Sequence, residues 1–258
     1  MLVRSWNLYH GNTVPPGRRN FLEQMVRLAT EDGPEVLCLQ ELPVWALPRL
    51  EEWGDMTALG DVAQRPMLGP FPFRAELGRR LTEVNPGLLR SAFSGQGNAI
   101  LTTLEALGRW RTVLNPGDLR RRTHVDLVTK LAWGKERRIC QAARLRLSDG
   151  RTAIVANLHA TGGHPAVTAA EIDRAASFAT GLAGPGEPVV LAGDFNTAPD
   201  LRGYGFDEAA ASDRISWGID HILVKGLHAG EQRSWPEEQR RLDGYLLSDH
   251  AAVEREVG

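Results

Sequence analysis

The sequence of 258 residues has only two cysteines and three lysines, and it contains no long apolar run. Cys38 and Cys140 lie in apolar, strand-like segments, so we expect two buried thiols rather than a disulfide or a metal-binding pair. No segment approaches the roughly 18 apolar residues that a membrane span needs, and the chain opens on a strand-like segment rather than a charged and then apolar leader. We therefore expect a cytoplasmic protein without a membrane partner.

Motifs of several common enzyme classes are also missing. The sequence contains neither a GxxxxGK phosphate loop nor a GxSxG nucleophile elbow, which argues against the commonest nucleoside triphosphatases and serine hydrolases. His159 and His164 stand five residues apart beside glycines, without the helical i, i+4 spacing and without a third soft ligand. They therefore do not predict a zinc site.

The charge is nearly balanced overall but unevenly distributed. Thirty basic residues stand against 32 acidic ones, which gives a net charge of -2, yet residues 109–138 contain nine basic and three acidic residues. Arg120, Arg121 and Arg122 in this segment are expected in a loop. Because arginine can donate two hydrogen bonds to one phosphate, the segment is consistent with a track for a nucleic-acid backbone. An ordinary solvated face of an arginine-rich protein explains it equally well.

A helix followed by a buried strand occurs twice along the chain. Apolar residues recur at helical spacing over 18–32 and again over 165–182. Each helix leads into a short apolar strand, EVLCLQE and PVVLAGD, and these strands end on Glu41 and Asp194. Ligands of open α/β sheets bind at the carboxyl ends of strands, so both carboxylates are candidates for a functional site.

The remaining pattern is rich in strands and poor in long helices. We expect residues 52–94 to form a long surface excursion. A parallel barrel needs a helix after nearly every strand, so two packed sheets with helices outside fit better, in one domain covering 1–258. Further strands are predicted at 2–8, 98–103, 125–133, 137–147, 152–160, 218–224 and 251–256.

Polar side chains stand at the ends of several predicted strands. Taken singly, each has an ordinary structural explanation, such as a solvated strand end or a turn. Taken together, Asp, Asn and Glu without a matching cysteine form an oxygen-rich set that suits Mg²⁺ or Mn²⁺. Mg²⁺ usually completes its coordination with water and substrate phosphate, so the set predicts a phosphate ester as substrate. The residues are Asn7, Glu41, His159, Asp194, Asn196, Asp249 and His250.

Seven short motifs occur in a characteristic order. They are WN at 6–7, QE at 40–41, GNAIL at 97–101, NLH at 157–159, GDFN at 193–196, IDHI at 219–222 and SDH at 248–250. The series resembles the endonuclease/exonuclease/phosphatase superfamily, metal-dependent phosphoesterases that include pancreatic-type deoxyribonuclease. The resemblance covers residue 3 to about residue 254. It implies a four-layered α/β/β/α sandwich in which two mixed β-sheets pack face to face with helices outside.

The resemblance also implies a role for each motif residue. Glu41 is implied as the main ligand of a Mg²⁺ or Mn²⁺ ion, with Asn7 and Asp249 beside it. Asp194 is implied to orient and deprotonate the attacking water, with Asn196 as its hydrogen-bonding partner. An aspartate of ordinary pKa is a poor base at neutral pH, so this role requires a raised pKa or a water acidified by the metal.

Two histidines complete the implied site. His250 is implied to contact the scissile phosphate and to be held by Asp220, and His159 is implied to lie across the phosphate as a second donor. A histidine at 159, where the abasic-site endonuclease branch has a tyrosine, argues against that branch. A glutamate supports this first histidine in pancreatic-type enzymes, and Glu76 and Glu83 are the candidates for it.

We expect a nuclease that cleaves phosphodiester bonds in DNA by attack of a metal-activated water. DNA is the expected partner, bound by Arg120, Arg121, Arg122 and Trp217, and the protein is expected to be a monomer. The alternative is a phosphatase or phosphodiesterase that acts on a small phosphorylated lipid, inositol or nucleotide. A binding module that has lost catalysis is less favoured, because every motif residue that can be placed is intact.

Overall fold

The computed structural model describes residues 1–17, 19–68, 71–72, 74, 76–77, 79–80, 94–208 and 218–258. Two mixed β-sheets form its centre. The first contains β1 (Leu2–Asn7), β3 (Val36–Leu42), β4 (Thr57–Gln64), β7 (Gln96–Thr102), β13 (Arg233–Ser234) and β16 (Val253–Glu256), in the order β13-β16-β1-β3-β7-β4. The second contains β8 (Glu105–Val113), β9 (Ile139–Arg146), β10 (Thr152–His159), β11 (Val189–Asp194) and β12 (Asp220–Lys225), in the order β12-β11-β10-β9-β8.

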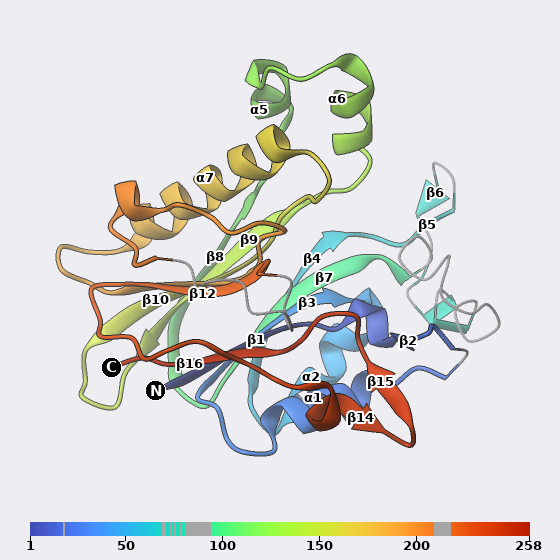
Figure 1. Cartoon of the computed structure of the whole chain (residues 1–258), viewed down its shortest axis with the longest axis horizontal. Helices are drawn as coiled ribbons and strands as arrows, with labels where there is room; N and C mark the ends of the chain where they lie inside the picture. The colour runs from blue at the N-terminus through green and yellow to red at the C-terminus, as the bar shows by residue number, and fades with distance from the viewer. Residues whose placement is uncertain are drawn as a thin grey trace.

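Helices cover the outer faces of both sheets. Figure 1 shows α7 (Pro165–Leu182) over the second sheet, and α1 (Leu22–Thr30) and α2 (Leu50–Gly54) against the outer face of the first. The short helices α5 (Gly117–Arg122) and α6 (Leu127–Trp133) lie together above α7. The predicted four-layered sandwich of two mixed sheets is therefore confirmed.

Smaller elements connect and extend these layers. Two minor sheets are formed by β14 (Arg241–Leu242), β15 (Tyr245–Leu247) and β2 (Thr13–Val14), and by β5 (Met67–Leu68) and β6 (Phe71–Pro72). The 3₁₀ helices are η1 (Tyr9–Gly11), η2 (Val44–Arg49), η3 (Arg202–Tyr204) and η4 (Glu237–Arg240). In the described part of the chain, no helix is both long enough and apolar enough to span a membrane.

Each main sheet contains one parallel strand pair, and these pairs position the strand ends. β1 runs parallel to β3, and β10 runs parallel to β11. The register of the second pair sets His159 directly opposite Asp194. β12 runs antiparallel to β11, so its first residue, Asp220, also lies opposite Asp194. Strand ends from both sheets therefore deliver their polar side chains to one edge of the sandwich.

An apolar layer fills the space between the sheets. It is built from side chains that alternate along the strands of both sheets, as expected for strands that pack face to face. Both cysteines are free and buried, which confirms the expectation of two buried thiols, and burial raises the pKa of the Cys38 thiol to about 12. The layer includes Val3, Val36, Cys38, Ile100, Val155, Val190 and Ile222.

A buried polar bridge crosses this layer just below the strand ends. Gln40 Nε2 donates to Asn157 Oδ1 at 2.8 Å, and Asn157 Nδ2 donates to the carbonyl oxygens of Leu39 and Ala99 at 3.0 Å and 2.9 Å. Both side chains are fully buried, so an unpaired group here would be costly. The bridge therefore fixes β10 against β3 and β7.

One predicted strand, at 125–133, is wrong because most of it forms helix α6. Asp126 caps this helix: its carboxylate accepts hydrogen bonds from the backbone N–H of Thr129 at 2.9 Å and from its hydroxyl at 2.5 Å. Such a cap satisfies N–H groups that the first helical turn leaves unpaired. The cap outweighs the strand preference of the β-branched residues in this segment.

Two expectations about loops also differ from the structure. Arg120, Arg121 and Arg122 belong to helix α5 rather than to a loop. The expected surface excursion at 52–94 begins with the end of α2 and with β4, an eight-residue edge strand paired along β7. The sequence pattern did not predict β4, because an edge strand is covered on fewer sides than a central one and its residues are a mixture of polar and apolar types.

The polar bridge yields a prediction on stability. Replacing Asn157 by alanine removes one of the three acceptors of Gln40 Nε2 and the side-chain donor to two backbone carbonyl groups, which we expect to lower the free energy of unfolding by about 2 to 3 kcal/mol. Urea denaturation followed by tryptophan fluorescence measures this change. Gln239→Ala, at an exposed position, is the matched control and should change stability little. A loss for Asn157→Ala no larger than for the control contradicts a role in joining the sheets.

Candidate active site

Residues of the predicted site meet at the edge where strands of both sheets end. Asn7 is the last residue of β1, and Glu41 lies near the end of β3. His159 and Asp194 are the last residues of β10 and β11. His250 stands between β15 and β16 and contacts Asp220, so motifs from across the chain converge as expected.

Unusual backbone conformations aim two of these side chains. Glu41 has a φ of 52° and Asn196 a φ of 56°, in the left-handed region that non-glycine residues rarely adopt. The pairing of β3 with β7 shifts register between Leu39 and Leu42, so Glu41 lies in an irregularity of its strand. Such local strain is commonly found at functional sites.

The glycine of the GDFN motif is required by space. Gly193 has a φ of 138°, and a Cβ atom at this position would lie 2.0 Å from the carbonyl oxygen of Leu158. Only glycine allows β11 to approach β10 so closely. The close approach places Asp194 beside His159: His159 Nε2 lies 3.4 Å from Asp194 Oδ2.

Asp220 and His250 form a close ion pair. His250 Nδ1 lies 2.8 Å from Asp220 Oδ2, and the Asp220 side chain is only 1% exposed. Burial opposes protonation of His250, but the charge and hydrogen bond of Asp220 outweigh it, with Asp194 and Asp249 adding to them, and raise the pKa of His250 to about 10. His250 is therefore a cation at neutral pH, and its Nε2 lies 3.8 Å from Asp194 Oδ2.

Asp194 is buried and fixed by two donors. Its Oδ2 accepts a hydrogen bond from Asn7 Nδ2 at 3.0 Å, and its Oδ1 accepts one from the backbone N–H of Asn196 at 2.9 Å. Burial, followed by the negative charge of Asp220, raises the pKa of Asp194 to about 7 despite the opposing charge of His250. A carboxylate with this pKa meets the requirement for a base at neutral pH.

A neutral and a cationic side chain contact the Nδ1 side of His159, whereas Asp194 and Glu41 lie near its Nε2. Gln96 Nε2 lies 3.1 Å from His159 Nδ1, and Arg138 Nη1 lies 2.8 Å and 2.9 Å from the two ring nitrogens. Burial, together with the positive charge of Arg138, lowers the pKa of His159 well below its usual value. His159 is therefore a neutral imidazole at neutral pH.

The expected glutamate partner of His159 is not Glu76. Glu76 is 58% exposed and pairs with Arg49 and Arg79 on the surface, and Glu83 lies outside the described residues. Gln96 and Arg138 were missed by the sequence analysis. Gln96 directly precedes the GNAIL motif and Arg138 belongs to the basic segment, so position and charge were the available signals.

Glu41 lies at the more open side of the site. Its side chain is 19% exposed, with Oε2 at 3.3 Å from His10 Nε2 and Oε1 at 3.7 Å from His159 Nε2. His10, in η1, was also missed, and nothing in the sequence pattern marks it. Asp249 stands next to His250 in the chain, and partial burial, with a further contribution from the negative charge of Glu41, raises its pKa despite the opposing charge of His250.

These carboxylates fit a divalent cation. Asp194, Asp220 and His250 offer ligand atoms within 4.8 Å of one another, and the buried Oδ1 of Asp220 has no hydrogen-bond partner. A protonated His250 cannot act as a metal ligand. The candidate ligands are therefore the carboxylates, including that of Glu41. Asn7 directs its Oδ1 to the backbone N–H of Tyr9 at 3.0 Å.

The predicted substrate-binding residues lie apart from this cluster. Arg122 pairs with Asp118 at 3.1 Å, and Arg120 packs against Gly134, where a Cβ atom would lie 2.0 Å from Nη1. Within the described chain, no hydrogen bond or ion pair joins Arg120, Arg121 or Arg122 to the residues of the site. Trp217 lies outside the described residues.

Comparison with known proteins identifies the family. The model of the Endonuclease/Exonuclease/phosphatase family matches residues 5–250. The chain belongs to this family. Members of the endonuclease/exonuclease/phosphatase family hydrolyse phosphate esters and generally depend on a divalent metal, so the resemblance inferred from the motifs is confirmed. A search of curated protein sequences found no match.

Solved structures of other proteins share the fold. A functionally unknown conserved protein from Enterococcus faecalis V583 has a TM-score of 0.69 and 17% identity, with 100% of this chain and 99% of that one covered. A mannosyl-6-phosphatase from Bacteroides thetaiotaomicron VPI-5482 has a TM-score of 0.63 and 17% identity, with 100% of this chain and 99% of that one covered. TDP2 from Caenorhabditis elegans has a TM-score of 0.63 and 16% identity, with 100% of this chain and 74% of that one covered. At such low identity, the likeness shows the fold alone.

The Asp220–His250 pair yields a prediction on protonation. The pKa of His250 in the folded protein is raised above the ordinary value of 6.5. The protonated His250 therefore stabilises the fold fully below about pH 6.5, and this contribution is lost as the pH rises through about 10. In Asp220→Asn, the pKa of His250 should fall toward its ordinary value. NMR titration of the imidazole in metal-free protein measures it, with Asp149→Asn as the control. A wild-type His250 that titrates near pH 6.5 contradicts the pair.

Proposed function

We propose that this protein is a divalent-metal-dependent phosphodiesterase that cleaves phosphodiester bonds in DNA. Hydrolysis of phosphate esters follows from the family, and the diester is our inference. The proposal is carried by one observation, the buried Asp194 carboxylate with a raised pKa between neutral His159 and protonated His250. This arrangement joins a base to two hydrogen-bonding groups, and we infer that one phosphate binds in the space beside these three side chains.

The metal is assigned to the open side of this space. Glu41 would be the main ligand of Mg²⁺ or Mn²⁺, with Asp249 and Asn7 beside it, because oxygen ligands suit these cations and the far side already holds the positive charge of His250. When bound, such a cation lowers the pKa of water and offsets the charge of the phosphate.

The side chains divide the remaining work. Asp194 accepts the proton of the attacking water through its carboxylate, whose Oδ2 is held by Asn7 Nδ2 and whose Oδ1 is held by the backbone N–H of Asn196. His250, protonated and oriented by Asp220, donates to a phosphate oxygen from Nε2. His159 donates from the opposite side to an equatorial oxygen or to the leaving group. Donors fixed before the reaction stabilise the developing charge without reorganisation.

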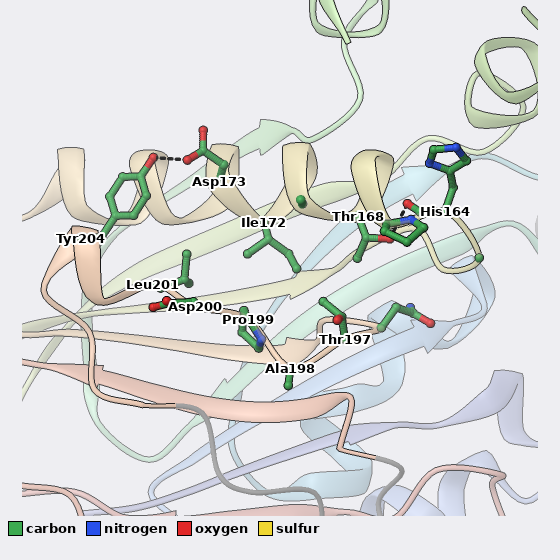
Figure 2. Close-up of a pocket in the computed structure, with 14 residues that line it drawn as sticks. His164, Thr168, Ile172, Asp173, Thr197, Ala198, Pro199, Asp200, Leu201 and Tyr204 are labelled. Carbon is green, nitrogen blue, oxygen red and sulfur yellow. Dashed lines mark hydrogen bonds between the residues drawn. The ribbon is translucent and has the colours of Figure 1, made fainter. Parts of the chain in front are cut away.

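A groove beside Asn196 can receive one of the two alcohols of a diester. It has a volume of about 670 Å³ and runs between α7 and residues 197–201. Figure 2 shows Thr168, Ile172 and Asp173 on the side of α7, opposite Thr197, Ala198 and Pro199. The groove therefore offers space for a group attached to the scissile phosphate.

The same groove favours a second candidate, a phosphatase that acts on a small hydroxyl-rich phosphate such as a phosphorylated sugar or inositol. Its far end holds Asp173 and Asp200, and the Tyr204 hydroxyl donates to Asp173 Oδ1 at 2.5 Å, drawn as a dashed line in Figure 2. No lysine or arginine lines it within the described chain. Carboxylates accept hydrogen bonds from hydroxyl groups and repel further phosphates.

Asp194→Asn tests the base. The substitution keeps the size of the side chain but removes the proton acceptor, so we expect kcat to fall by about 10² to 10⁴. Initial rates at saturating Mn²⁺, with the unfolding midpoint as a check on the fold, measure this. Asp149→Asn, at an exposed ion pair, should retain wild-type activity. Full activity in Asp194→Asn would remove Asp194 from this role.

A substrate panel tests the diester. Wild-type protein with Mn²⁺ is offered plasmid DNA, single-stranded DNA, RNA, bis(p-nitrophenyl) phosphate, p-nitrophenyl phosphate and a sugar phosphate. We expect cleavage of DNA and of the diester dye, its loss in EDTA, and its recovery when Mn²⁺ is restored in excess. Cleavage of monoesters alone contradicts the proposed nuclease function and favours the second candidate, the phosphatase. Undiminished activity in EDTA contradicts the metal requirement.

A further inference from the structure

A second groove, of about 660 Å³, lies where the edge strands of the two main sheets meet. β4 is the last strand of the first sheet and β8 the last strand of the second, and Arg111 Nη1 of β8 reaches the carbonyl oxygen of Val62 in β4 at 3.5 Å. We call it the arginine groove. It is lined by residues 60–65, Arg111 and Arg137.

The arginine groove carries excess positive charge. Three arginines line it, Arg65, Arg111 and Arg137, against a single carboxylate, Asp61. Asp61 lies 3.6 Å from Arg111. In the described part of the molecule, neither Arg65 nor Arg137 has a carboxylate within ion-pair distance. Like charges gathered around one groove repel each other, and a bound anion relieves this repulsion.

The walls of the groove lead directly to His159. The backbone N–H of Arg137 donates to Gln64 Oε1 at 3.2 Å, and Gln64 pairs with Gln96 across β4 and β7. Gln96 contacts His159, and Arg138, the residue after Arg137, contacts both ring nitrogens of His159. Two routes therefore join the groove to His159, each through a single intervening residue. One runs from Gln64 through Gln96, and the other runs from Arg137 through Arg138.

The two grooves beside the site differ in charge. The groove at Asn196 contains Asp173, contains Asp200 paired with Arg202 at 2.7 Å, and has no lysine or arginine among its described lining residues, whereas the groove on the His159 side contains three arginines. An anionic chain that leaves the site therefore meets more positive charge on the second side than on the first. The planar guanidinium group also matches the geometry of phosphate oxygens.

We propose that the arginine groove binds a phosphate next to the scissile one, so that the substrate is a chain with at least two phosphates that extends on the His159 side. This inference rests on the proposed function and deepens it. It also moves the anion track from Arg120, Arg121 and Arg122 on α5 to Arg65, Arg111 and Arg137.

A triple variant tests the groove. Arg65→Ala, Arg111→Ala and Arg137→Ala are combined, and wild type and variant are compared on a short single-stranded oligonucleotide and on bis(p-nitrophenyl) phosphate, which has a single phosphate. We expect kcat/KM for the oligonucleotide to fall at least about tenfold and its salt dependence to become shallower. Hydrolysis of the single-phosphate diester should stay within about twofold, because that substrate does not reach the groove.

Two further triple variants serve as comparisons. Arg27→Ala, Arg151→Ala and Arg241→Ala remove the same charge from exposed ion pairs elsewhere and should leave the oligonucleotide rate close to wild type. Arg120→Ala, Arg121→Ala and Arg122→Ala test the competing track on α5. An equal or larger loss in either comparison variant than in the groove variant overturns the proposal, as does wild-type cleavage of the oligonucleotide by the groove variant.

Binding separates the groove from the nuclease. Fluorescence anisotropy of a labelled oligonucleotide in EDTA reports binding without cleavage, and we expect Kd to rise at least about tenfold in the groove variant. If wild type binds the oligonucleotide in this way but does not cut it with Mn²⁺, the proposed nuclease fails and the groove stands. If the groove variant binds as tightly as wild type, or wild type does not bind, the groove proposal fails.

Discussion

The crowding of carboxylates at one end of the sandwich is the constraint on which the rest of the site depends. Asp194 and Asp220 lie opposite each other across β11 and β12, both buried, with Glu41 at the open side. Burial and the negative charge of Asp220 raise the pKa of Asp194. The protein compensates with a proton on His250, and the pKa of Asp194 is left near neutrality.

The fold maintains this unfavourable arrangement through its sheets. Two parallel strand pairs bring their carboxyl ends to one edge, and the Gln40–Asn157 bridge prevents the sheets from sliding apart beneath it. The left-handed backbone at Glu41 and the missing side chain of Gly193 belong to the same local strain. The apolar layers thus provide the stability that offsets the crowded carboxylates. The resulting site attracts cations and, with a cation bound, phosphate.

The sequence allowed the acidic half of the site to be predicted, but not its surroundings. Glu41 and Asp194 are recognisable because each ends a buried apolar strand, and the Asp220–His250 pair follows from the family motifs. Gln96 and Arg138 touch His159 only through pairings between distant strands, which no local pattern reveals. The segment 125–133 has strand-like composition, yet most of it forms helix α6, whose first turn is capped by Asp126.

The central claim is that water, activated beside Asp194, attacks the phosphorus of a phosphate ester. Hydrolysis of the diester dye in H₂¹⁸O with Mn²⁺, analysed by mass spectrometry of both products after a single turnover, tests it most directly. The account predicts one ¹⁸O atom in the phosphate product and none in the released alcohol. Label in the alcohol, or unlabelled phosphate in the first turnover with label in a carboxylate of the protein, would contradict it.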